Sequence, residues 1–343
     1  MIMKSLKYIF LILFSFVWLV GLSPSLKTKL DEWKLTEDGY RFGDLYRLSN
    51  LPQFKDPVKK CPKQIFVEKN NGSKKIHLYI IGDSFTEKER IEKEDFAVDQ
   101  YQYVHWDNIL HLKTDTSAIN ILLLESVERH FREKMISPIH NLVPDYETYV
   151  LKGPEPSFMN KLDLAFSSDG TEGRLDAVFF QNDILLKLKE MKAAFTYHFF
   201  HRADKKVTLV NNDKNVVYYL DTDTPQITSS FTDLEDSEVD SIVTNLSKSR
   251  ELAQKLGFDH VILSVIPNKV SVLMPEYGAY NNLISRVYAN PKLDIPYIDV
   301  LSDFRKMKEK AYLRGDSHWT CQAQDIWLHK TNELIKKVTQ ESI

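Results

Sequence analysis

Four continuous apolar runs mark the second part of the chain. They are "KIHLYII" (75–81), "INILLL" (119–124), "HVILSVI" (260–266) and "IPYIDVL" (295–301). Each run is short and does not alternate with polar residues, which is typical of strands buried on both faces. Helical patterns follow or separate them, in 125–135, 233–256 and 302–313. The order predicts an α/β fold with a parallel sheet covered on both faces.

Two of the predicted helices have clear end signals. Thr232 and Glu235 form a T-x-x-E capping box before the long helix, and Gly257 follows it where a left-handed residue is expected. Thr320 is a candidate cap for the final helix, in which one face is formed by Ala323, Trp327, Thr331, Leu334 and Val338.

Residues 145–230 interrupt the alternation of strands and helices. This segment holds a polar loop (152–173), a predicted helix from Asp176 to Phe195, and "VTLVNNDKNVVYYL" (207–220), which predicts a β-hairpin around a polar turn. We interpret it as an insertion within a domain of residues 75–340, where it is placed to form part of a substrate groove.

The N-terminus has a different character from the rest. Lys4 and Lys7 precede an uncharged, aromatic run at residues 8–22. This pattern over residues 1–24 is that of a secretory signal peptide or a signal-anchor, and the poor cleavage site favours an uncleaved anchor. The lysines predict that this end stays in the cytoplasm and that the remainder is exported to the periplasm or cell exterior. Residues 25–74 are charged and proline-containing and are interpreted as a tether and lead-in.

Composition narrows the functional classes. The 45 basic and 48 acidic residues are well mixed and give a net charge of −3, so nucleic acid is not an expected partner. The two cysteines, Cys61 and Cys321, lack the spacing of a zinc site. They are either two buried thiols or one bridge formed in an oxidising compartment.

The first predicted strand ends in Gly82-Asp83-Ser84. In open α/β sheets, ligands bind beyond the carboxyl ends of the strands, so Ser84 is a candidate nucleophile whose backbone N–H faces an incoming oxyanion. Asp83 is expected to hydrogen-bond inside the turn. The same tripeptide is also a good helix start, with Asp or Ser as N-cap, so Ser84 alone does not decide between these functions.

A serine nucleophile requires a base and an acid, and "RGDSHWT" (314–320) offers both. Asp316 and His318 lie two residues apart in a loop, which allows the carboxylate to orient the imidazole. The alternative is a solvated cap with an incidental histidine. This loop repeats the Gly-Asp-Ser tripeptide at 315–317, but only the first occurrence follows a strand.

These motifs resemble those of the SGNH (GDSL) hydrolases. "GDSF" after the first strand and "DSHW" before the last helix carry the resemblance, and "ESVER" (125–129) and "PNK" (267–269) are similar to the alginate O-acetyltransferase branch. The resemblance implies a three-layer flavodoxin-like fold, with Ser84 as nucleophile, His318 as base and Asp316 as its orienting acid. It further implies an acetyl-serine intermediate, with no cofactor and no metal.

The family usually completes its oxyanion hole with a glycine and an asparagine. We nominate Asn268, just after the strand 260–266, although it also fits an ordinary turn. Arg129 is a second candidate for the site; its spacing from Glu125 favours an ion pair within one helix.

The sequence therefore predicts an exported, membrane-anchored serine enzyme that O-acetylates a cell-surface or secreted polysaccharide. The acetyl donor would come from a membrane-bound acyltransferase. A carbohydrate O-acetylesterase is one alternative, and a non-catalytic glycan-binding or assembly subunit is another.

Overall fold

The computed structural model describes residues 2–33, 35–36, 40–63, 74–88, 90–144, 157–180 and 182–340, with only the backbone described at 2–5, 164 and 180. The chain forms two compact units. The N-terminal unit takes its residues from Met1–Arg41, Asn50–Pro52 and Glu147–Arg202. The sheet unit takes its residues from Phe42–Ser49, Gln53–Tyr146 and Ala203–Ile343.

The sheet unit is built on five parallel strands in the order β2-β1-β4-β8-β9. Their bounds are Gln100–His105 (β2), Ile76–Gly82 (β1), Ile119–Val127 (β4), His260–Ile266 (β8) and Tyr297–Ile298 (β9). Every residue of β1 and β4 is buried, which explains their unbroken apolar sequences. The prediction of an α/β fold with a parallel central sheet is confirmed.

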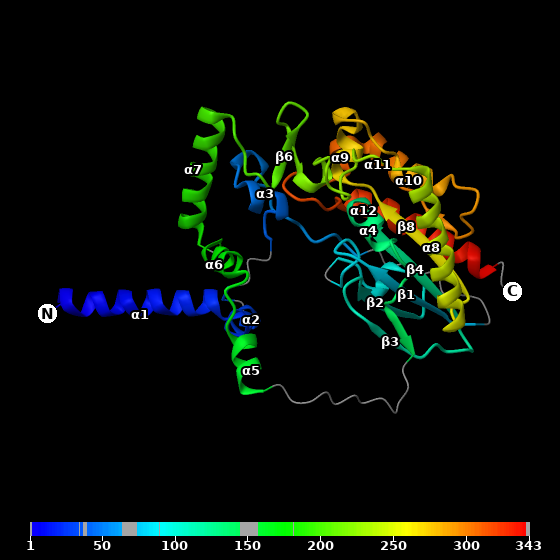
Figure 1. Cartoon of the computed structure of the whole chain (residues 1–343), viewed down its shortest axis with the longest axis horizontal. Coiled ribbons are helices and arrows are strands. Elements are labelled where there is room, and N and C mark those ends of the chain that lie inside the picture. The colour runs from blue at the N-terminus through cyan, green and yellow to red at the C-terminus, as the bar shows by residue number, and fades with distance from the viewer. Residues whose placement is uncertain are drawn as a thin grey trace. The chain divides into compact units, whose positions relative to one another are not determined.

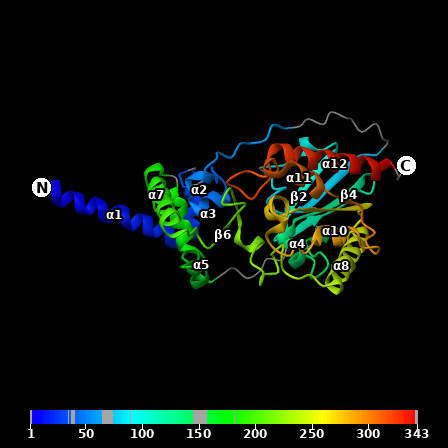
Figure 2. The same ribbon diagram turned by 90° about the horizontal axis from the view of Figure 1, so that it is seen from above.

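Helices lie on both sides of this sheet (Figure 2). Their bounds are Glu128–Lys134 (α4), Asp236–Lys255 (α8), Lys269–Leu273 (α9), Leu283–Tyr288 (α10), Leu301–Met307 (α11) and Cys321–Gln340 (α12). On α12, Ala323, Trp327 and Thr331 are fully buried, as the spacing predicted. The backbone N–H of Ala323 donates to the Thr320 hydroxyl at 3.4 Å, so the predicted cap of this helix is confirmed.

Two local predictions about helix starts are wrong. Strand β4 continues to Val127, because Glu125 and Ser126 still pair with β8, so the helix begins at Glu128 and not at 125. Helix α8 begins at Asp236 with Glu235 as N-cap, because the Thr232 hydroxyl instead donates to the carbonyls of Thr224 and Gln226. Gly257 has a φ of +91°, the left-handed conformation expected after α8.

The segment predicted as one insertion divides between the two units, and residues 145–156 lie outside the described part of the chain. Strands β6 (Val207–Val210) and β7 (Asn215–Tyr218) form the predicted hairpin in the sheet unit, with positive φ at 211–213. Helices α5 (Phe158–Ala165), α6 (Thr171–Phe180) and α7 (Asp183–Phe200) belong to the N-terminal unit. Asn182 caps α7 and thereby divides the helix predicted over 176–195.

The remaining elements are short. They are two strands that pair with each other, β3 (Leu110–Leu112) and β5 (Leu142–Pro144), a six-residue helix, α3 (Asp44–Ser49), and 3-10 turns at Pro52–Phe54, Lys93–Asp95, Tyr219–Asp221, Pro275–Tyr277 and Lys308–Lys310. Because 42–49 and 53–63 belong to the sheet unit, the predicted tether is in part a structural element of that unit.

The N-terminal unit begins with α1 (Ile2–Leu22) and α2 (Pro24–Glu32), seen in blue in Figure 1. Among the described residues, no helix is by itself long and apolar enough to cross a membrane. The pair Leu6–Leu22 and Pro24–Glu32, bent by 102°, meets that requirement by length and composition only.

Candidate active site

Ser84 lies just beyond the carboxyl end of β1, at the point where the chain's connections diverge. The chain passes from β1 to β2 on one side and later returns to β4 on the other. In register, Ile81 of β1 lies beside Leu124 of β4, which lies beside Leu263 of β8, so the three strands end at one edge. This is where ligands bind in open α/β sheets.

Ser84, His318 and Asp316 form a hydrogen-bonded chain. The Ser84 Oγ lies 2.8 Å from His318 Nε2, and His318 Nδ1 lies 2.5 Å from Asp316 Oδ1. An ionised carboxylate only accepts, so Nδ1 carries the ring proton and Nε2 is left to accept the Ser84 hydroxyl proton. The three predicted residues thus come together in the geometry of a nucleophile, a base and an orienting acid.

The three residues differ in burial. Asp316 and His318 are buried, whereas Ser84 is half-buried and remains accessible. Burial alone would raise the pKa of Asp316, but its hydrogen bond to His318 and the nearby positive charges hold that pKa well below its ordinary range. The acid therefore stays ionised. The Phe85 ring packs 4.7 Å from the His318 ring and restricts its rotation.

The turn that carries Ser84 is not the start of a helix, contrary to one reading of the sequence. Described residues 83–88 form turns. The Asp83 carboxylate accepts hydrogen bonds from Phe85 N at 3.0 Å and from Val127 N at 2.6 Å, which fastens the turn to the end of β4. Within the described part of the chain, the Ser84 backbone N–H has no hydrogen-bond acceptor, so it is available to an oxyanion.

The Glu125 carboxyl group holds this turn by two hydrogen bonds. Its Oε2 accepts from Asp83 N at 3.0 Å and from the Thr86 hydroxyl at 2.8 Å. A side chain at Gly82 would come within 2.9 Å of the same oxygen, which explains the glycine. Burial, together with the Asp83 charge, raises the pKa of Glu125 well above its ordinary value. Glu125 is therefore a strand residue, not the predicted helical partner of Arg129.

Residues 313–318, here called the triad loop, are held in shape by a buried lysine. The Lys269 ammonium donates to the carbonyls of Leu313, Arg314 and Asp316 at 2.7, 3.0 and 3.0 Å. Burial lowers the pKa of Lys269 to about 8, although nearby carboxylates oppose the shift. The loop is closed by Leu313 N donating to His318 O at 3.0 Å. Lys269 is thus a positioning residue for Asp316 and His318.

Residues of the lead-in also hydrogen-bond to the triad loop. Asp44, at the start of α3, accepts from Ser317 N at 2.7 Å and from the Ser317 hydroxyl at 2.5 Å. Tyr46 N donates to Gly315 O at 2.8 Å, and a side chain at Gly315 would collide with the backbone of Phe42 and Phe54. The loop can therefore pack against Phe42, Tyr46 and Phe54 only if position 315 is a glycine.

Asp44, Asp316 and His318 also place potential metal ligands within 4.8 Å of one another. In each case, however, the ligand atoms already have hydrogen-bond partners, Ser317 for Asp44 and His318 for Asp316. The cluster is satisfied by these contacts, and its geometry serves the loop rather than an ion.

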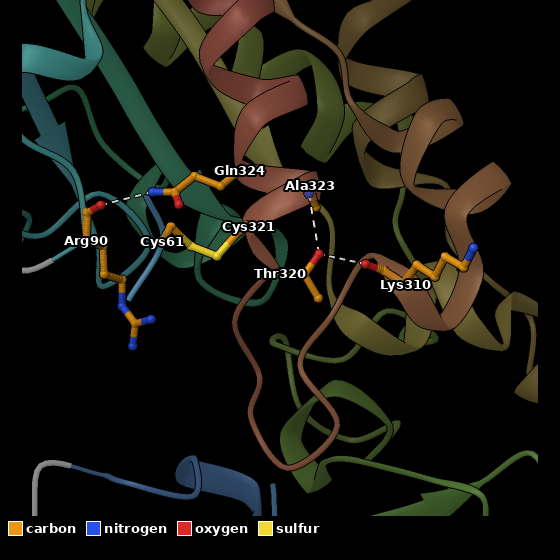
Figure 3. Close-up of a disulfide and its surroundings, with 7 residues drawn as sticks. All are labelled: Cys61, Arg90, Lys310, Thr320, Cys321, Ala323 and Gln324. Atoms are coloured by element: carbon orange, nitrogen blue, oxygen red, sulfur yellow. Dashed lines mark hydrogen bonds between the residues drawn. A yellow bond between two sulfur atoms is a disulfide. The ribbon is translucent and has the colours of Figure 1, made fainter. Parts of the chain in front are cut away.

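A disulfide lies just after the triad loop in the chain (Figure 3). Cys61 and Cys321 pair with Cα atoms 5.2 Å apart, so the lead-in is joined covalently to the first residue of α12. Nearby, the Gln324 amide donates to Arg90 O at 2.9 Å (Figure 3). Of the two expectations for the cysteines, the bridge is the one observed. It fixes the chain three residues after His318.

Asn268 and Arg129 have structural contacts that differ from the expected substrate contacts. The Asn268 side chain is fully buried, donates to Ser230 Oγ at 2.9 Å and accepts from Arg129 N at 3.1 Å. Its amide therefore joins α4 to the β8–α9 turn, and its N–H group is already bonded to Ser230. The Arg129 guanidinium pairs with Asp221 at 2.8 Å, and burial raises the pKa of Asp221 to about 6 although Arg129 opposes it.

Three residues of the site were missed from the sequence: Glu125, Lys269 and Asp44. Lys269 stood within the quoted "PNK" and Asp44 within a segment interpreted as tether, so only their long-range contacts identify them. Comparisons of the chain with family models, with curated proteins and with solved structures found no match. The functional argument therefore depends on the geometry of the site.

Proposed function

We propose that this protein is a serine acyltransferase or esterase of the SGNH type. The observation that carries the proposal is the chain of hydrogen bonds from Ser84 through His318 to Asp316. The strand order supports it: counted along the chain, the sheet reads 2-1-3-4-5, the flavodoxin-like order, with Ser84 at the switch point.

The proposed reaction has two halves. Ser84 Oγ attacks the acyl carbonyl carbon while its proton moves to His318 Nε2, and the Ser84 backbone N–H stabilises the resulting oxyanion. When the intermediate collapses, the leaving oxygen takes that proton and an acyl-serine remains. His318 then removes a proton from the acceptor hydroxyl, whose oxygen attacks the acyl carbon. The bond to Ser84 Oγ breaks, and His318 returns the proton to Ser84.

We propose acetyl as the acyl group and a hydroxyl of a cell-surface or secreted polysaccharide as the acceptor, on the basis of the resemblance described above. An exported location is supported by the Cys61–Cys321 bridge, since structural disulfides persist in oxidising compartments. The apolar α1 supports a membrane anchor. A membrane-bound acyltransferase would supply the donor.

The test is the intact mass of the purified full chain in detergent after exposure to p-nitrophenyl acetate. We expect one acetyl adduct in the wild type, none in Ser84→Ala or His318→Ala, and a retained adduct in the matched variant Ser317→Ala. Adding an oligosaccharide then separates the outcomes: acetylated sugar indicates a transferase, and free acetate indicates an esterase. No adduct or turnover with two different acyl esters would overturn the proposal in favour of a non-catalytic subunit.

A further inference from the structure

The N-terminal unit exposes an unusual amount of apolar surface on helices other than α1. On α7, one outward stripe has exposures between 54% and 74% and consists of Ile184, Leu188, Met191, Phe195 and Phe199. These positions follow helical spacing, so they form a single face. The opposite face is the packed one, since Leu186 and Glu190 are buried. The helix thus turns its more apolar side outward.

Helix α5, in the same unit, exposes further apolar side chains. Its exposed large side chains are Phe158, Met159 and Leu162, with Phe166 just after its end. Soluble proteins rarely expose apolar patches of this kind unless they contact a membrane or a partner. We therefore expect a membrane or a partner protein to cover these side chains.

Helix α1 favours a membrane over a protein partner. Its exposed side chains run almost without interruption and cover all sides of the helix, at Leu6, Tyr8–Phe14, Phe16, Trp18 and Leu19. A single protein partner covers one face of a helix, whereas a bilayer surrounds it. The exposure ends where protein contacts begin: Val20 is buried, and Arg174 of α6 donates to Gly21 O at 2.6 Å.

The arrangement of these helices matches a membrane surface. Figures 1 and 2 both show α7 running across the direction of α1, near the C-terminal end of α1. Helix α6 joins the two, since it contacts both α1 and α7. If α1 enters the bilayer along its normal, then α7 lies along the interface.

Charge favours an anionic leaflet. Helix α7 and its C-terminal flank carry four basic residues, Lys187, Lys189, Lys192 and Arg202, against two acidic ones, Asp183 and the buried Glu190. Lys187 pairs with Glu190 and Lys189 with Asp176 of α6, so the excess positive charge comes from Lys192 and Arg202. An apolar face bordered by lysines is the pattern of a helix that lies in the headgroup region.

We propose that α7 is an interfacial membrane helix whose stripe of Ile184, Leu188, Met191, Phe195 and Phe199 enters an anionic lipid surface beside α1. This inference rests on the membrane anchoring proposed above and is independent of the acyl-transfer chemistry. The unit would hold the chain on the membrane at two places, a penetrating helix and a surface helix.

The test places nitroxide spin labels on the full chain in vesicles of phosphatidylethanolamine and phosphatidylglycerol. The native cysteines are joined to each other, so Leu188→Cys, Phe195→Cys, Ile12→Cys and the control Lys248→Cys on α8 each offer one reactive thiol. Collision rates with oxygen report lipid, and those with a water-soluble nickel complex report solvent.

We expect labels at 188 and 195 to lie about 5–10 Å below the headgroups, with oxygen-to-nickel ratios at least about fivefold above that at 248. If 188 and 195 match 248 while 12 reports lipid, the anchor stands and the surface helix is overturned. If 188 and 195 are shielded from both reagents, a protein contact covers the stripe and the proposal also falls. If 12 reports water, the anchor falls and the proposal falls with it, because it places α7 beside an inserted α1.

Discussion

The tripeptide Gly-Asp-Ser occurs twice in this chain, and the two occurrences have opposite roles. In the first, at 82–84, the serine is the proposed nucleophile, bonded to His318, and the aspartate secures a turn by accepting from Phe85 N and Val127 N. In the second, at 315–317, the aspartate orients the base, and the serine is held by Asp44. The two occurrences meet at His318, 234 positions from Ser84.

The difference comes from what surrounds each tripeptide. The first follows a buried strand and is supported by Glu125. Its serine has a half-buried hydroxyl and an N–H for which the described residues supply no acceptor. The second packs against Phe42, Tyr46 and Phe54, and Lys269 binds the Asp316 carbonyl, while the Asp316 carboxylate bonds to His318. Identical short motifs therefore carry different chemistry when their distant neighbours differ.

The largest expected difference is between alanine substitutions of the two serines. Ser84→Ala removes the nucleophile and should lower kcat for an activated ester by about 10,000-fold or more. Ser317→Ala removes only a hydroxyl donated to Asp44, so it should lower the unfolding free energy by about 1.5–3 kcal/mol and leave most activity in place. Steady-state kinetics and urea unfolding measure both. Equal losses of kcat in the two variants would show that the roles are not separated.

The aspartates provide the next largest contrast. Asp316→Asn presents an amide to His318 Nδ1 and disfavours the required tautomer, so kcat should fall about 1,000- to 10,000-fold while the fold persists. Asp83→Asn cannot accept from both Phe85 N and Val127 N, and should cost about 1–3 kcal/mol of stability through the unpaired donor. Circular dichroism with kinetics distinguishes these outcomes. An inactive but fully stable Asp83→Asn protein would assign Asp83 to the chemistry instead.

Lys269 tests whether the second tripeptide depends on its buried support. Lys269→Met leaves three carbonyls of the triad loop without their donor, so kcat should fall about 10- to 100-fold, with KM nearly unchanged, because Asp316 and His318 lose their position. Stability should fall as well, by about 1–3 kcal/mol, from the unpaired carbonyls. The matched control is Lys306→Met on α11, whose ammonium is exposed. Activity equal in the two variants would remove Lys269 from the site.

The local sequence was enough to predict the parallel sheet and to single out Ser84, Asp316 and His318, which the structure brings together. Strands β1, β4 and β8 are continuous apolar runs, a pattern that few other structures produce. Asp316 and His318 are close in sequence, and Ser84 follows a strand, so the sequence alone identified them as candidates for an acid, a base and a nucleophile. Asn268 illustrates the limit, because an asparagine at a strand end has the same appearance whether it faces substrate or Ser230.

Contacts between distant segments account for what could not be predicted. Asp44 lies in a charged, proline-containing stretch with no periodicity, and only its bonds to Ser317 show that it belongs to the site. Glu125 was assigned to a helix because its spacing from Arg129 fits one, but pairing with β8 kept it in a strand. Helix starts were similarly misjudged, since the Thr232 hydroxyl had nearer carbonyls to bind.

The smallest expected effect is on the pH dependence of stability and concerns Glu125, which binds the first tripeptide. Burial and the Asp83 charge raise the pKa of Glu125, so the folded protein keeps a proton that the unfolded chain releases above its ordinary pKa. Between that ordinary value and the raised one, the unfolded state binds fewer protons, and stability falls as pH rises. Within the described residues, Glu125 Oε1 has no partner, which fits a neutral carboxyl.

Glu125→Gln preserves the oxygen that accepts from Asp83 N and Thr86 but cannot ionise. The stability of this variant relative to wild type should therefore grow with pH, by up to about 1.4 kcal/mol per pH unit within that window. Urea unfolding at pH 5, 6, 7 and 8 measures it, with the exposed Glu251→Gln as control. A constant difference across this range would mean that Glu125 is ionised in the fold. The carboxylates of Asp83 and Glu125 would then both be ionised, and the neutral state assigned to Glu125 would have to be withdrawn, although its two accepted hydrogen bonds would remain.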